Sequence, residues 1–340
     1  MKHLSLLTKA KVKTILNKRT GETKFGERIK ILSNALSIYD QLKDLDVRYV
    51  IFGINEDIGI QANHGKPGAY NAFDTTIKIL LNTQHNAFNQ GNKVCVLGTL
   101  EFDDLYLTLE EFEGTPKERL QLMRKMVVEI DKVVTELVHT IVGAGKVPIA
   151  IGGGHNNAYG LLKGSSLALK KPIHCINFDA HTDLRSEEGR HSGNGFTYAK
   201  SEGFLSRYSI FGLHENYTSQ AILEYMNAEE ERISYCTYEE IQVRKEKSAG
   251  TALKEAVAFI GKGAFGIEID CDAIEHVPSS AKTPSGFSVL QTRRFVSQVA
   301  TVKTTYLHIC EAAPNKKDKF GVGKLISYLI TDFINAREMV

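Results

Sequence analysis

The chain has 340 residues, of which 42% are hydrophobic and 24% are charged, a balance typical of soluble globular proteins. Its sequence contains no uninterrupted apolar run long enough to cross a bilayer, and its first residues lack the apolar core of a secretion signal. Length and composition therefore argue against a membrane-spanning or secreted protein and favour one large α/β domain.

The net charge of +2 is unevenly spread along the chain. Residues 1–30 contain nine Lys or Arg and two Glu, a surplus of seven positive charges. A basic tail can bind nucleic acid, but no recognisable nucleic-acid motif accompanies this one, so we expect no such partner. We expect residues 1–47 to form a basic segment with a helix, either solvated or in contact with a second subunit, packed on a single domain of residues 48–340.

The five cysteines are scattered and form no CxxC pair. Most lie in apolar, strand-like runs; they are Cys95, Cys175, Cys236, Cys271 and Cys310. This pattern predicts reduced, buried thiols in a cytoplasmic protein and argues against a disulfide framework.

From residue 48 onward, strand-like and helical patterns alternate. Strands are expected at residues 48–54, 93–98, 147–151, 172–176, 208–212, 264–270 and 306–311. Helices are expected at residues 74–81 (capped by Asp74), 117–142, from about 157, 219–227, 252–260, 289–302 and 323–336. A polar loop is expected over residues 55–70, and an irregular segment between residue 98 and about residue 116. This alternation predicts an α/β fold, with a mainly parallel sheet of about eight strands covered by helices on both faces.

The most informative stretch follows the apolar run at residues 172–176. Asp179, His181 and Asp183 are two residues apart, so on extended chain their side chains point to the same face. Two carboxylates and an imidazole held together in this way favour a divalent cation, because without one they would repel and be poorly solvated. A solvated polar loop is the alternative for this stretch taken alone.

Other strand ends supply further ligand-type side chains: His155 after a glycine run, Asp270 and Asp272, and Glu311. In a parallel sheet, ligands bind beyond the carboxyl ends of the strands, so these groups are expected at one edge. Four aspartates and two histidines exceed what one cation needs, which favours two cations that share a carboxylate. Oxygen-rich ligand sets favour Mn²⁺, or Mg²⁺, over tetrahedral zinc, and two metals about 3.5–4 Å apart activate a bridging water.

These motifs carry a family resemblance. Gly153-Gly154-His155, Asp179-Ala180-His181-Thr182-Asp183 and Asp270-Cys271-Asp272 resemble the signature motifs of the arginase, agmatinase and formimidoylglutamase (ureohydrolase) family, in its order and spacing. The resemblance runs from about residue 48 to the C-terminus. It implies an arginase-like three-layer α/β/α fold, hydrolysis of a C–N bond in a guanidino or formimino group, two Mn²⁺ per subunit, and a homo-oligomer, either trimer or hexamer. The implied metal ligands are His155, Asp179, His181, Asp183, Asp270 and Asp272.

Several stretches resemble the formimidoylglutamase branch in particular. They are Gly152-Gly153-Gly154-His155, Asp183-Leu184-Arg185, and the runs at residues 52–60 and 65–69. The third motif departs from the family pattern, because Glu268 stands where Ser or Thr is usual and Glu275-His276 where Asp-Pro is usual. Residues 192–196 also depart from the stretch common in that branch. These changes leave the ligands intact and leave the substrate open.

The resemblance also implies roles for residues around the metals. Glu311 would receive the planar amidine of the substrate, because a carboxylate accepts two parallel N–H donors. Asp183 would orient the attacking hydroxide, and His191 would shuttle protons. Candidates for holding a substrate α-carboxylate are Arg185, Ser192 and Asn194. His64 is interpreted as a structural loop histidine near the mouth of the site.

We therefore expect a cytoplasmic hydrolase that converts N-formimidoyl-L-glutamate, a small-molecule substrate, to glutamate and formamide. One alternative is a guanidino-compound hydrolase of the agmatinase, arginase or guanidinobutyrase type, which would release urea. The other is a catalytically silent binding or regulatory protein of the same fold, which the altered third motif and the basic N-terminus would favour. A single-zinc deacetylase of a related fold fits less well, because such enzymes use fewer aspartates.

Overall fold

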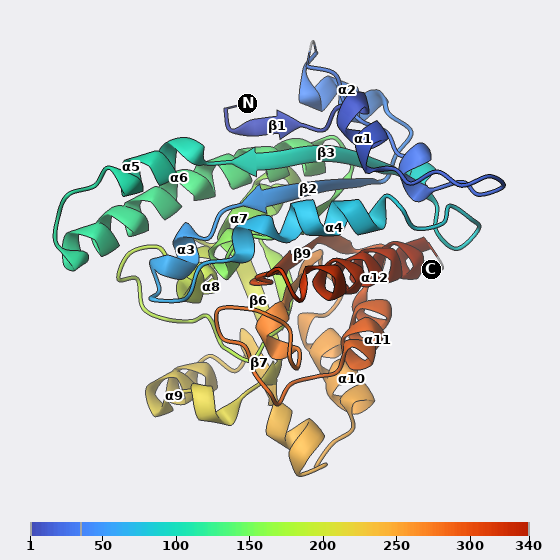
Figure 1. Cartoon of the computed structure of the whole chain (residues 1–340). Coiled ribbons are helices and arrows are strands. Elements are labelled where there is room, and N and C mark those ends of the chain that lie inside the picture. The colour runs from blue at the N-terminus through green and yellow to red at the C-terminus, as the bar shows by residue number, and fades with distance from the viewer. Residues whose placement is uncertain (1, 35, 339–340) are drawn as a thin grey trace.

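The computed structural model describes residues 2–34 and 36–338, and a nine-stranded sheet runs through it (Figure 1). In spatial order the strands are β1 (Leu4–Leu6), β3 (Val94–Glu101), β2 (Tyr49–Asn55), β4 (Val147–Ile151), β9 (Thr304–Cys310), β8 (Phe265–Asp270), β5 (Ile173–Phe178), β6 (Leu205–Leu213) and β7 (Ile233–Thr237). Neighbouring strands are parallel throughout, except that β1 pairs antiparallel with β3.

Helices cover both faces of this sheet (Figure 1). On one face lie α4 (Ala72–Leu80), α10 (Ala249–Ile260), α11 (Val289–Val299) and α12 (Lys319–Glu338). On the other face lie α6 (Pro116–Gly143), α7 (Ala158–Leu169) and α8 (Gly195–Ser201). The remaining helices are α1 (Lys9–Ile15), α2 (Ile38–Asp44), α3 (Ile58–Gln61), α5 (Asp103–Glu110) and α9 (Gln220–Ala228). The expected α/β fold with both faces of the sheet covered is confirmed.

The alternation of side chains along a strand creates two hydrophobic cores, one per face. On β2, Tyr49 and Ile51 pack with the helices of the first face, whereas Val50 and Phe52 pack with those of the second. All seven residues of β2 are buried, as expected for an inner strand of a parallel sheet.

Local sequence explains where the longest helix begins. Thr115 and Glu118 form a capping box at the start of α6, and Pro116 occupies its first turn, where a missing N–H costs nothing. The apolar positions expected from helical spacing, such as Met126, Val127 and Ile130, are buried against the sheet.

Every strand and helix expected beyond residue 47 is present, within a few residues of its expected bounds. Two strands were not expected, β1 in the basic segment and β7. The prediction of an irregular segment before residue 116 was wrong in part, because it contains α5, and the expected loop at 55–70 contains α3. The expected capping role of Asp74 was also wrong: Asn71 is the N-cap of α4, and Asp74 lies in the first turn, where its charge favours the helix dipole.

The basic segment is joined to the rest of the molecule through β1 and through apolar side chains. Leu7, Val12 and Phe25 belong to the core on the α4 side of the sheet. The five cysteines are buried and free, as expected from their spacing. Within the described part of the chain, no helix combines the length and apolar character needed to span a bilayer.

Candidate metal centre and active-site cavity

Four neighbouring strands in the middle of the sheet, β4, β9, β8 and β5, end at one edge. His155 follows β4, Glu311 follows β9, Asp270 ends β8, and Asp179 follows β5. These strands are far apart in sequence, so the sheet order is what brings the polar residues together. The expectation that they share an edge agrees with this arrangement.

The six expected metal ligands form two overlapping clusters. One contains His155, Asp179, Asp183 and Asp270, and the other contains Asp179, His181 and Asp272. In the first, Nδ1 of His155 lies 3.2 Å from Asp179, 2.9 Å from Asp183 and 3.1 Å from Asp270. In the second, Nδ1 of His181 lies 3.0 Å from Oδ2 of Asp272 and 3.7 Å from Oδ1 of Asp179. Asp179 belongs to both clusters, as a carboxylate that bridges two cations must.

Hydrogen bonding shows that these groups are suited to cations. Nδ1 of His155 and Oδ1 of Asp272 are buried without a hydrogen-bond partner among the described residues. Buried polar atoms are ordinarily paired, so unpaired ones aimed at a shared centre fit a bound ion. A donor set rich in carboxylates, with one imidazole in each cluster, suits six-coordinate Mn²⁺ or Mg²⁺.

The charges in the clusters are strongly coupled. Burial raises the pKa of Asp270, and the nearby Asp272 carboxylate adds to this effect. Burial also raises the pKa of Asp183. Although burial opposes it, hydrogen bonding to His155 and His181 lowers the pKa of Asp179. Cation binding must therefore displace protons from this group of residues.

Two of the site residues adopt backbone conformations that L-residues rarely occupy. Asp183 has a φ of 49° and Glu311 a φ of 60°, both in the left-handed region. Such conformations cost free energy and persist where the surrounding structure fixes them, often at functional sites. Glu311 directly follows β9, and Asp183 lies in the loop after β5, at the edge of the sheet on which the clusters lie.

A cavity of about 330 Å³ opens beside the two clusters. Its lining includes His181, Asp183, Asp270, Asp272 and Glu311, together with Asn63, His64, Arg185, Ser192, Tyr217 and Ser280. Four of the six expected ligands therefore surround one space with Glu311, Arg185 and Ser192, whereas His155 and Asp179 do not line it. His64, interpreted as a loop histidine near the mouth, also lies on this wall.

Glu311 is buried and held by two donors. One carboxylate oxygen accepts the backbone N–H of His155 at 2.9 Å, and the other accepts the Ser280 hydroxyl at 2.9 Å. Burial raises the pKa of Glu311 to about 8. A buried carboxylate whose charge is disfavoured gains most from a cationic partner that enters the cavity.

Arg185 and Ser192 are linked by Asn63. The Asn63 amide oxygen accepts from the Arg185 guanidinium at 3.0 Å, and its NH₂ donates to the Ser192 hydroxyl at 3.2 Å. Arg185 is 56% exposed on its side chain, so the guanidinium keeps donors free for a ligand. These three residues form a polar part of the wall of the cavity that Glu311 also lines, suited to a carboxylate.

The structure does not bring His191 and Asn194 to the cavity. The His191 ring is fully buried; Nδ1 accepts from the Gly193 N–H and Nε2 faces Glu188 at 3.2 Å. Burial lowers the pKa of His191 to about 4, so the ring is neutral and both nitrogens are in use. A proton-shuttling role would need a free nitrogen facing the substrate.

Asn194 instead fastens its own loop. Its amide oxygen accepts from Arg190 and from the His191 N–H, and its NH₂ donates to the carbonyls of Ser186 and Gly189. The side chain is buried, with its hydrogen-bonding capacity occupied. It therefore positions residues 186–191 and has nothing left to offer a substrate.

An outer hollow of about 600 Å³ adjoins the cavity and shares His181, Tyr217, Ser280 and Ala281 with it. Lys66 and Lys282 line this hollow, and among the described residues its lining contains no carboxylate. Both lysines are exposed, and no ion pair or hydrogen bond engages either of them within the described chain. The space therefore has an acidic inner end and a basic outer end.

Tyr217 stands where the two spaces meet. Its ring stacks on His181 with 5.2 Å between ring centroids and 19° between planes, and on its other side it stacks on His214 at 5.3 Å. This arrangement supports the His181 ring and gives the cavity a flat aromatic wall.

Several contributors were not found by sequence reasoning. Asn63 precedes His64, which the sequence analysis had noted. Its hydrogen bonds to Arg185 and Ser192 are tertiary contacts, which the sequence does not reveal. Ser280 lies in a loop without a motif. Glu56, at the carboxyl end of β2, is buried and accepts from the Gly154 N–H and from two asparagine side chains, which fixes the turn before His155. Its place after a strand was a usable signal, because the same strand-end rule identified the ligands.

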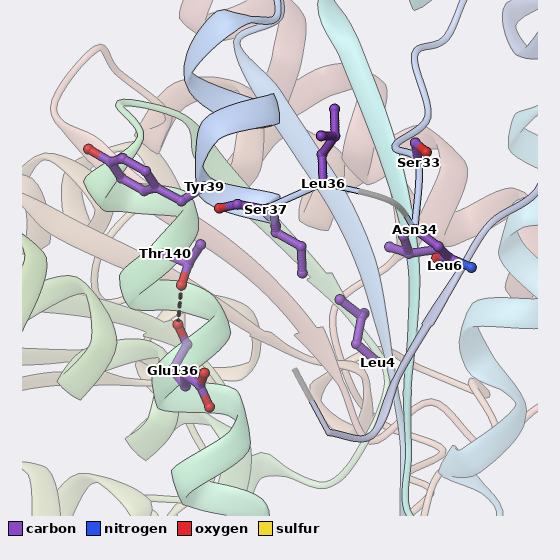
Figure 2. A pocket seen from close by; sticks show the side chains of 10 residues that line it. Leu4, Leu6, Ser33, Asn34, Leu36, Ser37, Tyr39, Glu136 and Thr140 are labelled. Atoms are coloured by element: carbon purple, nitrogen blue, oxygen red, sulfur yellow. Dashed lines mark hydrogen bonds between the residues drawn. The ribbon is translucent and has the colours of Figure 1, made fainter.

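Another hollow, of about 420 Å³, lies elsewhere, between β1, residues 33–34 and 36–39, and α6 (Figure 2). Leu4, Leu36 and Tyr39 border it, and Thr140 donates to the Glu136 carbonyl within α6 (Figure 2). Within the described residues, it contains no cluster of metal-ligating side chains.

The fold and the two clusters define a class of protein: an α/β protein with a paired cation site at the edge of its parallel sheet. Comparison with protein families makes this specific, because the arginase family model matches residues 47–330. The chain therefore belongs to the arginase family.

Curated proteins that the sequence resembles include formimidoylglutamases. A formimidoylglutamase of Hahella chejuensis is 28% identical over 248 residues, covering 67% of this chain and 63% of that protein. One of Chromobacterium violaceum is 30% identical over 183 residues, covering 51% of this chain and 50% of that protein. The matches thus span between half and about two thirds of the length of these relatives.

Solved structures show the same fold. Bacillus subtilis formimidoylglutamase superposes with a TM-score of 0.73 at 17% identity, covering 95% of this chain and 94% of that one. Trypanosoma cruzi formiminoglutamase, solved with Mn²⁺, gives a TM-score of 0.70 at 18% identity, covering 93% of this chain and 98% of that one. At these identities the likeness establishes the arginase-like fold.

Proposed function

We propose that this protein hydrolyses N-formimidoyl-L-glutamate to L-glutamate and formamide, with two Mn²⁺ held in the paired clusters. Membership of the arginase family, relatives named formimidoylglutamase, and a structural neighbour solved with Mn²⁺ support this proposal. The observation that carries the choice of substrate is the polarity of the cavity, acidic inside and basic outside.

The metal ligands would be the six residues of the two clusters, with Asp179 shared between them. When bound, two cations supply a water activated at neutral pH and stabilise negative charge that develops in the transition state. The protein's own contribution is to hold the ligands in place and to limit the site to a small cavity.

Glu311 would receive the formimino end of the substrate. An amidinium presents parallel N–H donors, and a carboxylate accepts them side by side. Ser280 and the His155 N–H fix the orientation of this carboxylate. The formimino carbon is thereby directed toward the edge of the sheet that carries the clusters.

Asp183 would orient the attacking water and accept its proton. It lines the cavity, and burial raises the pKa of its carboxyl group, which favours proton uptake. The same proton can then pass to the departing nitrogen of glutamate. Because His191 is buried with both ring nitrogens engaged, it is not assigned this step.

Arg185, with Asn63 and Ser192, would bind a carboxylate of the glutamate portion. A guanidinium donates two parallel N–H bonds to a carboxylate. Lys66 and Lys282 would add positive potential around the second carboxylate, in a hollow that lacks opposing acids. A guanidino substrate with a cationic tail, such as agmatine, would meet repulsion at the same place.

The dependence of activity on metal and the role of Arg185 in binding the glutamate portion of the substrate can be tested together. Protein stripped of metal should be inactive, and added Mn²⁺ should restore formamide release, whereas Asp179→Ala should remain inactive with Mn²⁺. Arg185→Met should raise KM for N-formimidoyl-L-glutamate by about 10- to 100-fold, the loss of a charge-assisted hydrogen bond, with a smaller effect on kcat. Full activity without metal, or an unchanged KM in Arg185→Met, would contradict the proposal.

We further propose a cytoplasmic location, supported by five free, buried cysteines, and a homo-oligomeric state. Fractionation of cells and light scattering of the purified protein would test these two points.

A further inference from the structure

Beneath the candidate metal centre lies a layer of buried polar side chains on the same face of the sheet. Asn177, Glu268 and His308 are paired across β5, β8 and β9, and all three are fully buried. Each lies two residues before a residue at the end of its strand or just beyond it: Asn177 before Asp179, Glu268 before Asp270 and His308 before Cys310. Side chains two residues apart on a strand point to the same face. None of these three residues has a role in the proposed hydrolysis.

Glu268 is the centre of this layer. One carboxylate oxygen accepts the Tyr306 hydroxyl at 2.7 Å, and the other lies 2.6 Å from Nδ1 of His308. The latter oxygen also faces Nε2 of His155 at 3.5 Å.

His308 extends the layer to the turn that carries His155. Its Nε2 faces the Gly152 carbonyl at 3.2 Å. Gly152 adopts a φ of 87°, a conformation that residues with a side chain rarely adopt. The turn before His155, through the Gly152 carbonyl, and Nε2 of the His155 ring thus both lie against the network of Glu268 and His308.

The local sequence makes room for this network at a cost. A Cβ added to Gly266 would lie 2.1 Å from Cζ of Tyr306, so this glycine is what allows the tyrosine ring to cross β8 and reach Glu268. Burying a carboxylate is costly because its charge must be desolvated, and the hydrogen bonds from Tyr306 and His308 offset part of that cost.

Resting on the proposed function, we propose that Glu268 is a positioning residue for the metal centre: its carboxylate lies 3.5 Å from Nε2 of His155, where it would accept the Nε2–H and so fix the tautomer whose Nδ1 faces Asp179, Asp183 and Asp270. A histidine ligand must offer its lone pair to the cation, and the hydrogen bond made by its other nitrogen selects that form. Tyr306 and His308 hold Glu268 in place. Because His181 belongs to the other cluster, the effect is confined to one of the two cations.

The cluster of Glu268, His308 and Cys310 could itself be read as a cation site, since their ligand atoms lie close together. Two observations favour positioning. Glu268 and His308 are already hydrogen-bonded to each other. The Cys310 thiol faces the Ile269 carbonyl at 3.6 Å, and burial raises the pKa of this thiol. A thiol in this state is a poor metal ligand.

The test is a Mn²⁺ titration of metal-free protein, followed through the electron paramagnetic resonance signal of free Mn²⁺. In the unchanged protein we expect two bound ions. In Glu268→Gln, which keeps the shape but removes the charge, we expect one ion bound as before and one bound about 10- to 100-fold more weakly. Tyr306→Phe, which removes one support of Glu268 and leaves the carboxylate, should weaken the same ion by a smaller factor.

Glu268→Asp provides a second variant if the glutamine form does not fold, because it keeps the charge but withdraws it from His155; it should weaken the same single ion. Two ions bound with unchanged affinity in a folded Glu268 variant would overturn the inference. Equal weakening of both ions would also overturn it, since that points to a general structural role. An unchanged protein that binds no Mn²⁺ would overturn the proposed function and this inference with it.

Discussion

At the scale of single residues, the carboxylates around the cavity differ in what holds them. The aspartates of the two clusters lie against histidine nitrogens, whereas Glu311 is held by a backbone N–H and by Ser280. Glu311 is therefore free to serve a ligand from the cavity, and burial raises its pKa to about 8.

This difference predicts that changing Glu311 lowers turnover of the substrate but leaves Mn²⁺ binding unchanged. Glu311→Gln should reduce kcat/KM for N-formimidoyl-L-glutamate by about 10- to 100-fold, because one charge-assisted hydrogen bond contributes about 1.5–3 kcal/mol. Mn²⁺ affinity should stay close to that of the unchanged protein, since Glu311 belongs to neither cluster. Steady-state kinetics and Mn²⁺ titration measure the two quantities.

Ser280→Ala is the matched control, because it removes one support of Glu311 and leaves the carboxylate. Its kcat/KM should fall by less than about tenfold, the effect of one neutral hydrogen bond. If Glu311→Gln lost Mn²⁺ as Asp179→Ala is expected to, Glu311 would be a metal ligand and its assignment would be wrong.

The grouping of the candidate metal ligands could be predicted from sequence because its signal is local. Asp179, His181 and Asp183 follow one strand at two-residue spacing, which predicts a shared face where the chain stays extended. The loop residues lacked such a constraint. His191 and Asn194 have the chemistry of site residues, but the direction of their side chains is decided by contacts with Glu188 and Arg190, which spacing does not reveal.

At the scale of elements, the loop between β5 and α8 is fixed from behind by a buried ion pair. Arg190 donates to Asp131 of α6 at 2.8 Å and to the Asn156 carbonyl at 3.0 Å. Its guanidinium also lies over the rings of Tyr159 and Tyr198, about 5 Å from each centroid. The loop that presents Arg185 and Ser192 to the cavity is thus tied to the helix layer.

Breaking the ion pair between Arg190 and Asp131 should destabilise the folded protein. Arg190→Met leaves the Asp131 carboxylate buried without its partner, which typically lowers the free energy of unfolding by about 3–5 kcal/mol. Urea denaturation of the metal-free protein measures this change. The double variant Asp131→Leu/Arg190→Met removes both charges and should recover part of the loss; a single variant as stable as the unchanged protein would show that the pair does not anchor the loop.

The elements that sequence reasoning missed are short or lack periodicity. β1 is three residues long, within a basic segment, and it forms because β3 offers an open edge for pairing. β7 is an edge strand on which two of five residues are half-buried, which weakens the apolar signal. Longer elements with buried stripes, such as α6, were predictable because packing and pattern agree.

At the scale of the whole molecule, the centre of the sheet edge concentrates negative charge that the fold alone does not neutralise. Burial and the Asp272 carboxylate raise the pKa of Asp270, which means that its ionised form is disfavoured in the folded protein. Cations bound at the clusters would relieve this repulsion, so folding and metal binding should be coupled.

Metal removal should therefore lower thermal stability. Mn²⁺ at 100 times its dissociation constant should stabilise the folded protein by about 2.7 kcal/mol for each site, and Tm should rise accordingly. Asp270→Asn should lose the part of this response that comes from its own cluster, while its metal-free form should be at least as stable as that of the unchanged protein, because a disfavoured charge is gone. Calorimetry with Mn²⁺ or EDTA measures both; a Tm indifferent to Mn²⁺ would contradict the coupling.

The overall order of strands could not be predicted either, although the α/β class could. Alternating patterns indicate crossovers, but they do not say that β9 and β8 lie between β4 and β5. That insertion makes His155, Glu311, Asp270 and Asp179 neighbours, and it arises from long-range pairing across the whole chain.

Product identification is the most direct test of the proposed activity. Protein reconstituted with Mn²⁺ would be incubated separately with N-formimidoyl-L-glutamate, arginine, agmatine and 4-guanidinobutyrate, and formamide, urea, ammonia and glutamate would be quantified. We expect equal amounts of formamide and glutamate from the first compound, with kcat/KM at least about 100-fold above the others because their tails lack the paired carboxylates. Urea from a guanidino compound, or no Mn²⁺-dependent product from N-formimidoyl-L-glutamate, would contradict this assignment.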